Sequence, residues 1–163
     1  RRGLGIARAL YAEEYGDVRE TGFVTNDKFA TEEGTGFTIG CSPDGLCGDD
    51  GMIECKSRIQ KYQVQTIVEE YTGVSLIPDE YMLQVQTGLL VCERKWCDFI
   101  SYSGGLPMAV IRVEADTEIQ EAIVAAAGGF EERILTIIAD YRKAIEARKY
   151  PPTERRVEEE MVI

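Results

Sequence analysis

The sequence predicts one α/β or α+β domain with a mixed central sheet. Segments of helical period alternate with segments of strand character, in the order helix, three or four strands, helix, two strands, helix. The length of 163 residues suffices for one domain with a substantial core and is short for two. We therefore expect a single domain over residues 1–150 and a poorly packed C-terminal tail over 151–163.

The first half of the chain is predicted to contain one helix and most of the sheet. Apolar residues recur at helical spacing over residues 4–15, and Gly16 is a suitable stop. A strand is expected over 18–25, followed by a turn at "TND" and a longer connection at "TEEGTG". Strands are then expected over 37–41 and 51–56, with the hairpin turn "GDDG" leading into the second.

The second half is predicted to be mainly helical. A short helix is possible at residues 61–70, within a stretch of mixed signals. A proline followed by two acids starts a helix that runs from 78 to about 91. Two strands follow at 96–102 and 109–114. A helical period extends from 116 to about 149, and we expect Gly128-Gly129 to break or kink it.

Composition excludes several kinds of chemistry. The chain has no histidine, which rules out Ser-His-Asp and Cys-His catalysis and most zinc hydrolase sites. Its five cysteines form no C-x-x-C pair, so we expect reduced, mostly buried thiols in a cytoplasmic protein. No run of about 18 apolar residues indicates a membrane span. The first residue is Arg1 rather than methionine, so we expect the chain to begin inside a longer gene product.

The net charge of −11 bears on possible partners. Contacts to phosphate come from lysine and arginine, so this charge argues against a broad electrostatic surface for nucleic acid. A local basic groove remains compatible with it, because a sum over the whole chain does not describe one face.

The stretch "SPDGLCGDDGMIECK", residues 42–56, contains the strongest candidate site. Asp44 precedes a hairpin, and Glu54 and Lys56 follow ten and twelve residues later. Side chains alternate along a strand, so Glu54 and Lys56 should share a face while Cys55 points to the other. The hairpin brings Asp44 towards Glu54, and two such carboxylates repel each other unless a cation or a proton lies between them.

Mg²⁺ suits this arrangement, because it binds one or two carboxylates and keeps several waters. We expect Asp44, Glu54 and the backbone carbonyl of Cys55 to hold it, with Mn²⁺ able to substitute. Lys56 could orient or help to deprotonate an attacking water and stabilise charge on a phosphate. The alternative is an ordinary solvated hairpin with an incidental ion pair, since an acid–x–lysine triplet alone is common.

Two motifs carry a resemblance to a known family. "CSPDGLCGDDGMIECK" resembles the PD-(D/E)xK nuclease signature, in the form found in the phage lambda exonuclease or YqaJ-like recombinase family. "YMLQVQTGLLV" at 81–91 is similar to the helix that follows it in that family, and "AR" at Ala7-Arg8 is similar to its first helix. The family's usual glutamate three residues before "AR" is replaced here by Leu4.

The resemblance implies a restriction-endonuclease-like mixed sheet flanked by helices, and it implies roles for individual residues. Asp44 and Glu54 would be metal ligands, Lys56 the catalytic lysine, and Gln84 a contact to the phosphate. Ser42 would lie near the 5′-phosphate of the bound strand. Further candidates for contacts to DNA or phosphate are Arg58, Lys61 and Gln86.

The implied activity is a Mg²⁺-dependent exodeoxyribonuclease that resects ends of double-stranded DNA from 5′ to 3′ in phage-type recombination. The resemblance also implies a homo-oligomer (a ring-shaped trimer), a single-strand annealing protein as partner, and a phage- or prophage-encoded protein in the bacterial cytoplasm. Two alternatives stay open: a PD-(D/E)xK endonuclease of restriction or repair type, and a catalytically inactive acidic interaction module with the same fold.

Overall fold

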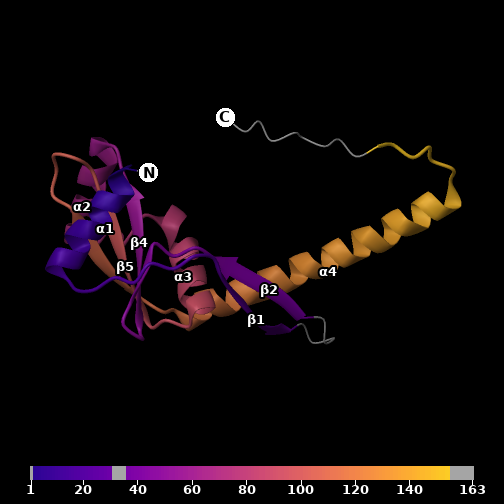
Figure 1. Ribbon diagram of the computed structural model, residues 1–163, viewed down its shortest axis with the longest axis horizontal. Coiled ribbons are helices and arrows are strands. Elements are labelled where there is room, and N and C mark those ends of the chain that lie inside the picture. Colours follow the sequence, from indigo (N-terminus) through magenta and orange to yellow (C-terminus); the bar gives the residue numbers. More distant parts are fainter. Residues whose placement is uncertain (1, 31–35, 155–163) are drawn as a thin grey trace. The chain divides into compact units, whose positions relative to one another are not determined.

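The computed structural model describes residues 2–30 and 36–154 of the chain (Figure 1). Helices and strands alternate there much as predicted. In chain order, the elements are α1 (Arg2–Glu14), β1 (Val24–Ala30), β2 (Gly36–Cys41), β3 (Gly45–Cys47), β4 (Gly51–Ser57), α2 (Gln60–Thr72), α3 (Asp79–Cys92), β5 (Trp96–Tyr102), β6 (Ala109–Glu114) and α4 (Thr117–Ala147).

The central sheet is mixed, as the sequence predicted. Its strand order is β3-β4-β5-β6. The inner strands β4 and β5 run parallel, and each pairs with its outer neighbour in antiparallel fashion. Strands β1 and β2 form a separate antiparallel pair. The connection between parallel β4 and β5 passes through α2 and α3, as the geometry of a parallel crossover requires.

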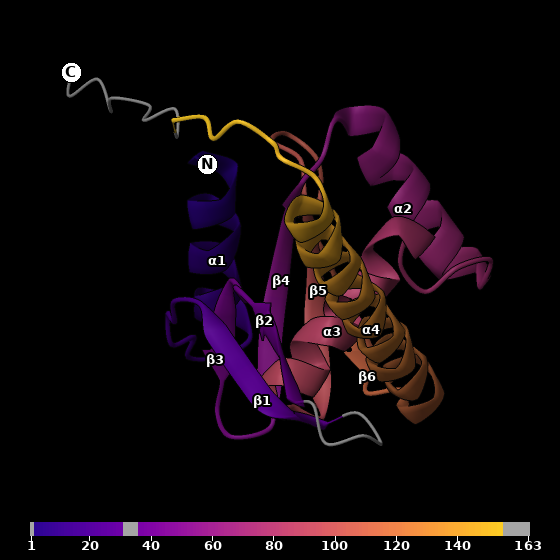
Figure 2. The same ribbon diagram turned by 90° about the vertical axis from the view of Figure 1, so that its right-hand side faces the viewer.

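Helices cover the two faces of this sheet. Alternate residues of β4 and β5 point to opposite sides, and Figure 2 shows α1 on one side of these strands. The face towards α3 is apolar through Met52, Phe99, Val85, Leu89 and Val113. The face towards α1 is apolar through Ile53, Cys55, Ile100, Ala7 and Tyr11. A polar side chain on β4 or β5 therefore contacts residues of either α1 or α3, depending on the face of the sheet to which it points.

The hairpin turn before β4 requires glycine for steric reasons. A Cβ on Gly51 would lie 2.2 Å from the Trp96 ring on the neighbouring strand β5. Gly48, in the same turn, has φ 55°, in the left-handed region. The glycines of "GDDG" thus fix the turn that brings Asp44 back towards β4.

The expected strand over 18–25 and the turn at "TND" are both wrong. Strand β1 begins at Val24, and within the predicted range Arg19 forms an isolated bridge to Leu46. Asn26 lies inside the strand, where its side chain accepts a hydrogen bond from the Lys28 backbone N–H at 3.1 Å. The pairing register shifts at this point. The turn-forming chemistry of asparagine thus produces a bulge within a strand and no chain reversal.

The helix predictions hold better. Helix α2 extends the short helix expected at 61–70 and ends at Gly73, with φ 71°. Of the break or kink expected at Gly128-Gly129, the break is wrong, since α4 is helical throughout. Two helical glycines cost only about 1 kcal/mol each relative to alanine, which a 31-residue helix tolerates. The chain nevertheless divides at this point into two compact units, residues up to Gly128 and residues from Gly129 onward.

The cysteines are free thiols as expected, but the prediction that most of them are buried is wrong, since three of the five are only partly buried. All five cysteines are free thiols, and Cys55 and Cys97 are buried. Burial raises the pKa of the Cys55 thiol to about 12, so that it stays protonated at neutral pH. None of the described helices is both long enough and apolar enough to cross a membrane. The expected connection over 31–36 lies almost entirely outside the described residues, as does most of the tail over 151–163.

Candidate active site on strand β4

Glu54 and Lys56 lie side by side on the face of β4 that meets α3. The Lys56 Nζ donates to Glu54 Oε1 at 2.6 Å. Glu54 is only 5% exposed, whereas Lys56 reaches partly into solvent. The alternation predicted from the sequence therefore yields a buried carboxylate beneath an accessible ammonium group.

Gln84 on α3 completes a closed set of three hydrogen bonds. Its Nε2 donates to Glu54 Oε1 at 2.8 Å, and its Oε1 accepts from Lys56 Nζ at 2.8 Å. The Tyr81 ring lies one helical turn earlier, 4.9 Å from the Lys56 ammonium. A cation at this distance from a ring face is attracted by its quadrupole. The three groups are thus held in one geometry by contacts from two elements.

Asp44 joins this cluster through the backbone of β4. Strand β3 begins at Gly45, which pairs with Ile53, so no further β3 backbone continues the ladder opposite Cys55. The Cys55 N–H donates instead to Asp44 Oδ2 at 2.7 Å. Arg8 of α1 donates to the Asp44 backbone carbonyl at 3.3 Å. The Asp44 side chain thus takes the place of a backbone partner of Cys55, which explains why Asp44 directly precedes β3.

The electrostatics of Glu54 favour a cation beside it. Burial raises the pKa of the Glu54 carboxyl, and the hydrogen bond and charge of Lys56 oppose that rise. The nearby negative charge of Asp44 raises the pKa further. A positive ion bound between the two carboxylates would stabilise both in their ionised form.

These residues fit a hard divalent cation. Asp44, Glu54 and the Cys55 carbonyl offer only oxygen donors, which Mg²⁺ prefers. Both hydrogen bonds to Glu54 use Oε1, and within residues 2–30 and 36–154 none uses Oε2. No group of three or more His, Cys, Asp and Glu side chains in that part of the chain is arranged so that it could hold a metal ion. A site of two carboxylates suits an ion that retains several waters.

The remaining residues predicted to contact DNA lie at different places around this cluster. Ser42 is exposed two residues before Asp44. Arg58 lies just after the end of β4, and its guanidinium donates to Glu80 at 3.0 Å. Lys61 lies exposed on α2.

Gln86 is not brought to this cluster. It is 1% exposed, and its amide donates to the Glu114 carbonyl and accepts from the Asp116 N–H. We therefore interpret Gln86 as a bridge between α3 and the start of α4.

Arg8, Tyr81 and Glu80 also belong to this region, and no role was predicted for them from sequence. A signal for the last two was present, because residues three and four positions before Gln84 share its face of a helix. Arg8 could be connected to Asp44 only through the packing of α1. Leu4, on the preceding turn of α1, packs against the apolar cluster on that face.

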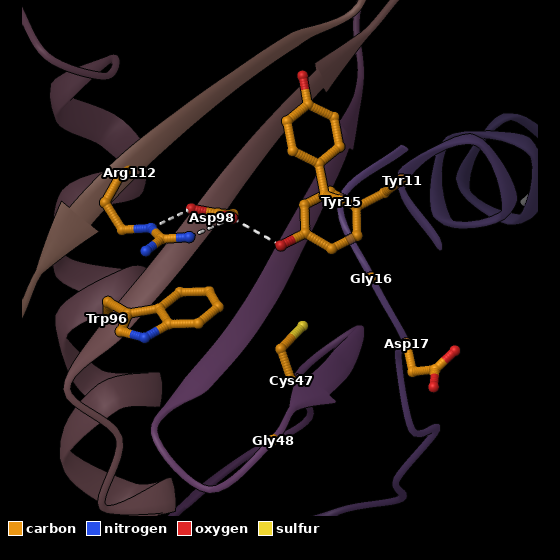
Figure 3. A pocket seen from close by; sticks show the side chains of 9 residues that line it. All are labelled: Tyr11, Tyr15, Gly16, Asp17, Cys47, Gly48, Trp96, Asp98 and Arg112. Atoms are coloured by element: carbon orange, nitrogen blue, oxygen red, sulfur yellow. Dashed lines mark hydrogen bonds and ion pairs between the residues drawn. The ribbon is translucent and has the colours of Figure 1, made fainter. Parts of the chain in front are cut away.

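A second polar cluster lies on the opposite face of the sheet, around a pocket of about 380 Å³ (Figure 3). Asp98 of β5 is 2% exposed at this pocket. It accepts hydrogen bonds from Tyr11 of α1 and from Arg112 of β6. Both carboxylate oxygens of Asp98 thus accept hydrogen bonds, Oδ1 from Arg112 and Oδ2 from Arg112 and Tyr11.

A family match decides the relationship of this chain to known proteins. The model of the YqaJ-like viral recombinase domain matches residues 5–95, more than half of the sequence. The chain belongs to this family. The resemblance read from the two motifs is thereby confirmed, and the matched region of the YqaJ-like domain includes Asp44, Glu54, Lys56 and Gln84.

Solved structures show the same relationship. This chain is 33% identical to the alkaline exonuclease LHK-Exo from Laribacter hongkongensis, with a TM-score of 0.64 over 88% of this chain and 71% of that chain. Against LHK-Exo in complex with dAMP, the identity is 34% and the TM-score 0.64, over 90% and 74% of the two chains.

The protein SSO0001 is 14% identical with a TM-score of 0.54, over 78% and 55%, and shows the fold alone. No curated protein gives a match.

Proposed function

We propose that this chain is a metal-dependent exodeoxyribonuclease acting on ends of double-stranded DNA, from 5′ to 3′. The observation that carries the proposal is the contact of Glu54 with Lys56 and Gln84, with Asp44 anchored beside them on Cys55. The similarity to LHK-Exo, an alkaline exonuclease, supports the reaction class. Polarity and the requirement for a free end are part of the proposal.

Asp44, Glu54 and the Cys55 carbonyl would hold Mg²⁺, or Mn²⁺ in its place. Such a bound cation supplies an acidified water and a Lewis acid for the phosphate. Lys56 holds its ammonium above the buried carboxylate, where it can donate a hydrogen bond to the attacking water and balance charge on the phosphate. Gln84 fixes the direction of Lys56, and its amide can donate to a phosphate oxygen.

The strongly acidic composition is compatible with a DNA substrate. Three cationic residues, Arg8, Lys56 and Arg58, lie at or beside the cluster. DNA is bound through such local positive groups, while a net charge of −11 disfavours binding elsewhere on the surface. We propose that Ser42 and Lys61 add contacts to the same strand.

Linear and closed circular duplexes provide the decisive test. We expect the chain to degrade an end-labelled linear duplex in Mg²⁺, to leave closed circles intact, and to do nothing in EDTA. Separate 5′ and 3′ labels report the polarity. Nicked circles would replace the exonuclease by an endonuclease of restriction or repair type. If neither substrate is cut in Mg²⁺ or Mn²⁺, the inactive interaction module is the better reading.

We further propose a homo-oligomer, a trimer by resemblance to the family, working with a single-strand annealing protein in the cytoplasm of a bacterial host. The unit that begins at Gly129 supports self-association. Within its described residues it is a single helix followed by residues without helix or strand. This helix carries an apolar stripe at helical spacing, formed by Phe130, Ile134, Ile137, Ile138, Tyr141 and Ile145. A lone helix cannot bury such a stripe by itself.

Charge in this stripe should therefore reduce self-association. We expect Ile138→Arg to lower the mass measured by light scattering over a range of protein concentrations, because Ile138 lies in the middle of the stripe. Ala139→Arg is the matched control, since residue 139 lies on the opposite side of the helix and adds the same charge. An unchanged mass for Ile138→Arg, or a monomeric parent chain, would contradict the proposal.

A further inference from the structure

Arg58 differs from an ordinary surface arginine. It directly follows strand β4, and its guanidinium lies over the same Tyr81 ring as the Lys56 ammonium. Its side chain is only 8% exposed. The guanidinium lies 5.1 Å from the Tyr81 ring and 5.2 Å from the Tyr62 ring. These contacts hold the guanidinium in place. Along an extended backbone, residue 58 lies two residues, about 6.6 Å, beyond Lys56.

The hydrogen bonds of this guanidinium are incomplete. An arginine has five N–H donors in a planar fork that suits two oxygens of one anion. In the part of the chain that the structure describes, one carboxylate contacts it, through Nη1 and Glu80 at 3.0 Å. Its Nε is buried without a hydrogen-bond partner. A buried, preorganised arginine with unused donors beside a phosphodiester site is suited to a phosphate.

Glu80, the partner of Arg58, is exposed and loosely held. It lies on α3 one turn before Gln84, and its side chain is 64% exposed. A single contact to an exposed carboxylate contributes little free energy and is easily exchanged. The arginine is therefore fixed and the carboxylate is displaceable.

The surroundings also disfavour a purely structural ion pair. Arg58 and Glu80 line a pocket of about 270 Å³ together with two more acids, Glu69 and Asp79. Three carboxylates near one guanidinium exceed what is needed to neutralise it. This excess of negative charge opposes DNA at the cationic residue that comes next after Lys56.

We propose that Glu80 is a carboxylate placeholder that occupies the phosphate position on Arg58 until DNA displaces it. Its carboxylate oxygens stand in for oxygens of the phosphate adjacent to the scissile one on the same strand. This proposal rests on the proposed function for the identity of its ligand. It adds a binding subsite and a device that lowers the affinity for DNA until the correct phosphate arrives.

The test measures binding of a fluorescent 5′-phosphorylated duplex in EDTA at fixed salt, where no cleavage interferes. We expect Glu80→Gln to tighten binding by about two- to fivefold, the range of an exposed ion pair. Asp79→Asn is the matched control: it makes the same change in charge one residue away, on an acid that makes no ion pair with Arg58. It should change the dissociation constant by less than about twofold.

Arg58→Met should weaken binding by at least about tenfold and reduce the slope of log affinity against log salt by about 1. A role in folding alone would leave that slope unchanged. In the Arg58→Met background, Glu80→Gln should no longer tighten binding, because no guanidinium remains to be uncovered. Thermal unfolding of each variant identifies any that fold poorly.

Weaker binding in Glu80→Gln would overturn the proposal, because it would mean that Glu80 only orients Arg58. Equal gains from Glu80→Gln and Asp79→Asn would also overturn it, in favour of a general charge effect. The nuclease function and the placeholder role of Glu80 can be refuted independently. A chain that never cleaves DNA in Mg²⁺ but binds it more tightly as Glu80→Gln refutes the nuclease and retains the placeholder.

Discussion

Replacement of Lys56 by methionine should reduce the rate of DNA hydrolysis by about 10²- to 10³-fold. Methionine keeps an unbranched apolar stem and removes the ammonium that lies over Tyr81 and bonds Glu54 and Gln84. The loss should appear in the maximal rate at saturating DNA, since an interaction made with the developing charge acts on the chemical step. Initial rates on a linear duplex in Mg²⁺ measure it.

The folded state should survive this change. Burial already raises the pKa of Glu54, so without Lys56 the carboxyl can take up a proton in place of remaining a buried, unpaired anion. Lys95→Met is the matched control, because Lys95 is an exposed lysine paired with Asp50 before β5. Full activity in a folded Lys56→Met variant would remove Lys56 from the proposed mechanism.

The part of this site that could be predicted from sequence is the part that depends on local geometry. Glu54 and Lys56 are two residues apart, and the period of a strand places them together whatever the rest of the fold does. Asp44 needed one further step, a hairpin whose turn was recognisable from its glycines. Gln84 is 28 residues from Lys56, and only the family resemblance connected the two.

Other contacts depend on how elements pack, which local periodicity does not determine. The Arg58–Glu80 pair requires the rotation of α3 about its axis. Gln86 shares a helix with Gln84, but two residues correspond to a rotation of 200°, so one amide faces the site and the other faces the start of α4. The wrong turn at "TND" has a local cause instead, because the asparagine that forms the bulge in β1 also favours turns.

The Asp98 cluster was not predicted, and it joins three elements that lie far apart in sequence. Arg112 Nε and Nη2 donate to the two carboxylate oxygens at 2.6 and 2.9 Å, and Tyr11 donates its hydroxyl at 2.6 Å (Figure 3). The guanidinium stacks 3.6 Å from the Trp96 ring. Burial raises the pKa of Tyr11, and the bond to Asp98 adds to that rise, so this hydroxyl remains a donor throughout the physiological range.

The two halves of this ion pair should contribute unequally to stability, because their exposure differs. Asp98 is buried, whereas the Arg112 side chain is 50% exposed. Arg112→Met leaves a buried carboxylate with only Tyr11 as side-chain partner and should lower the free energy of unfolding by about 3–5 kcal/mol. Asp98→Asn leaves a guanidinium that water can reach and should cost only about 1–3 kcal/mol.

Urea unfolding of both single variants and of the double variant measures this asymmetry. The double variant should recover part of the loss of Arg112→Met, since the charge that was left unpaired is then absent. If Asp98→Asn is the more damaging change, the lost hydrogen bonds of Asp98 outweigh the burial of its charge. Nuclease activity of the folded variants should stay near that of the parent chain, because this cluster and the Glu54 site lie on opposite faces of the sheet. The same sheet then separates a cluster whose charges are satisfied within the protein from one whose carboxylates still favour a cation.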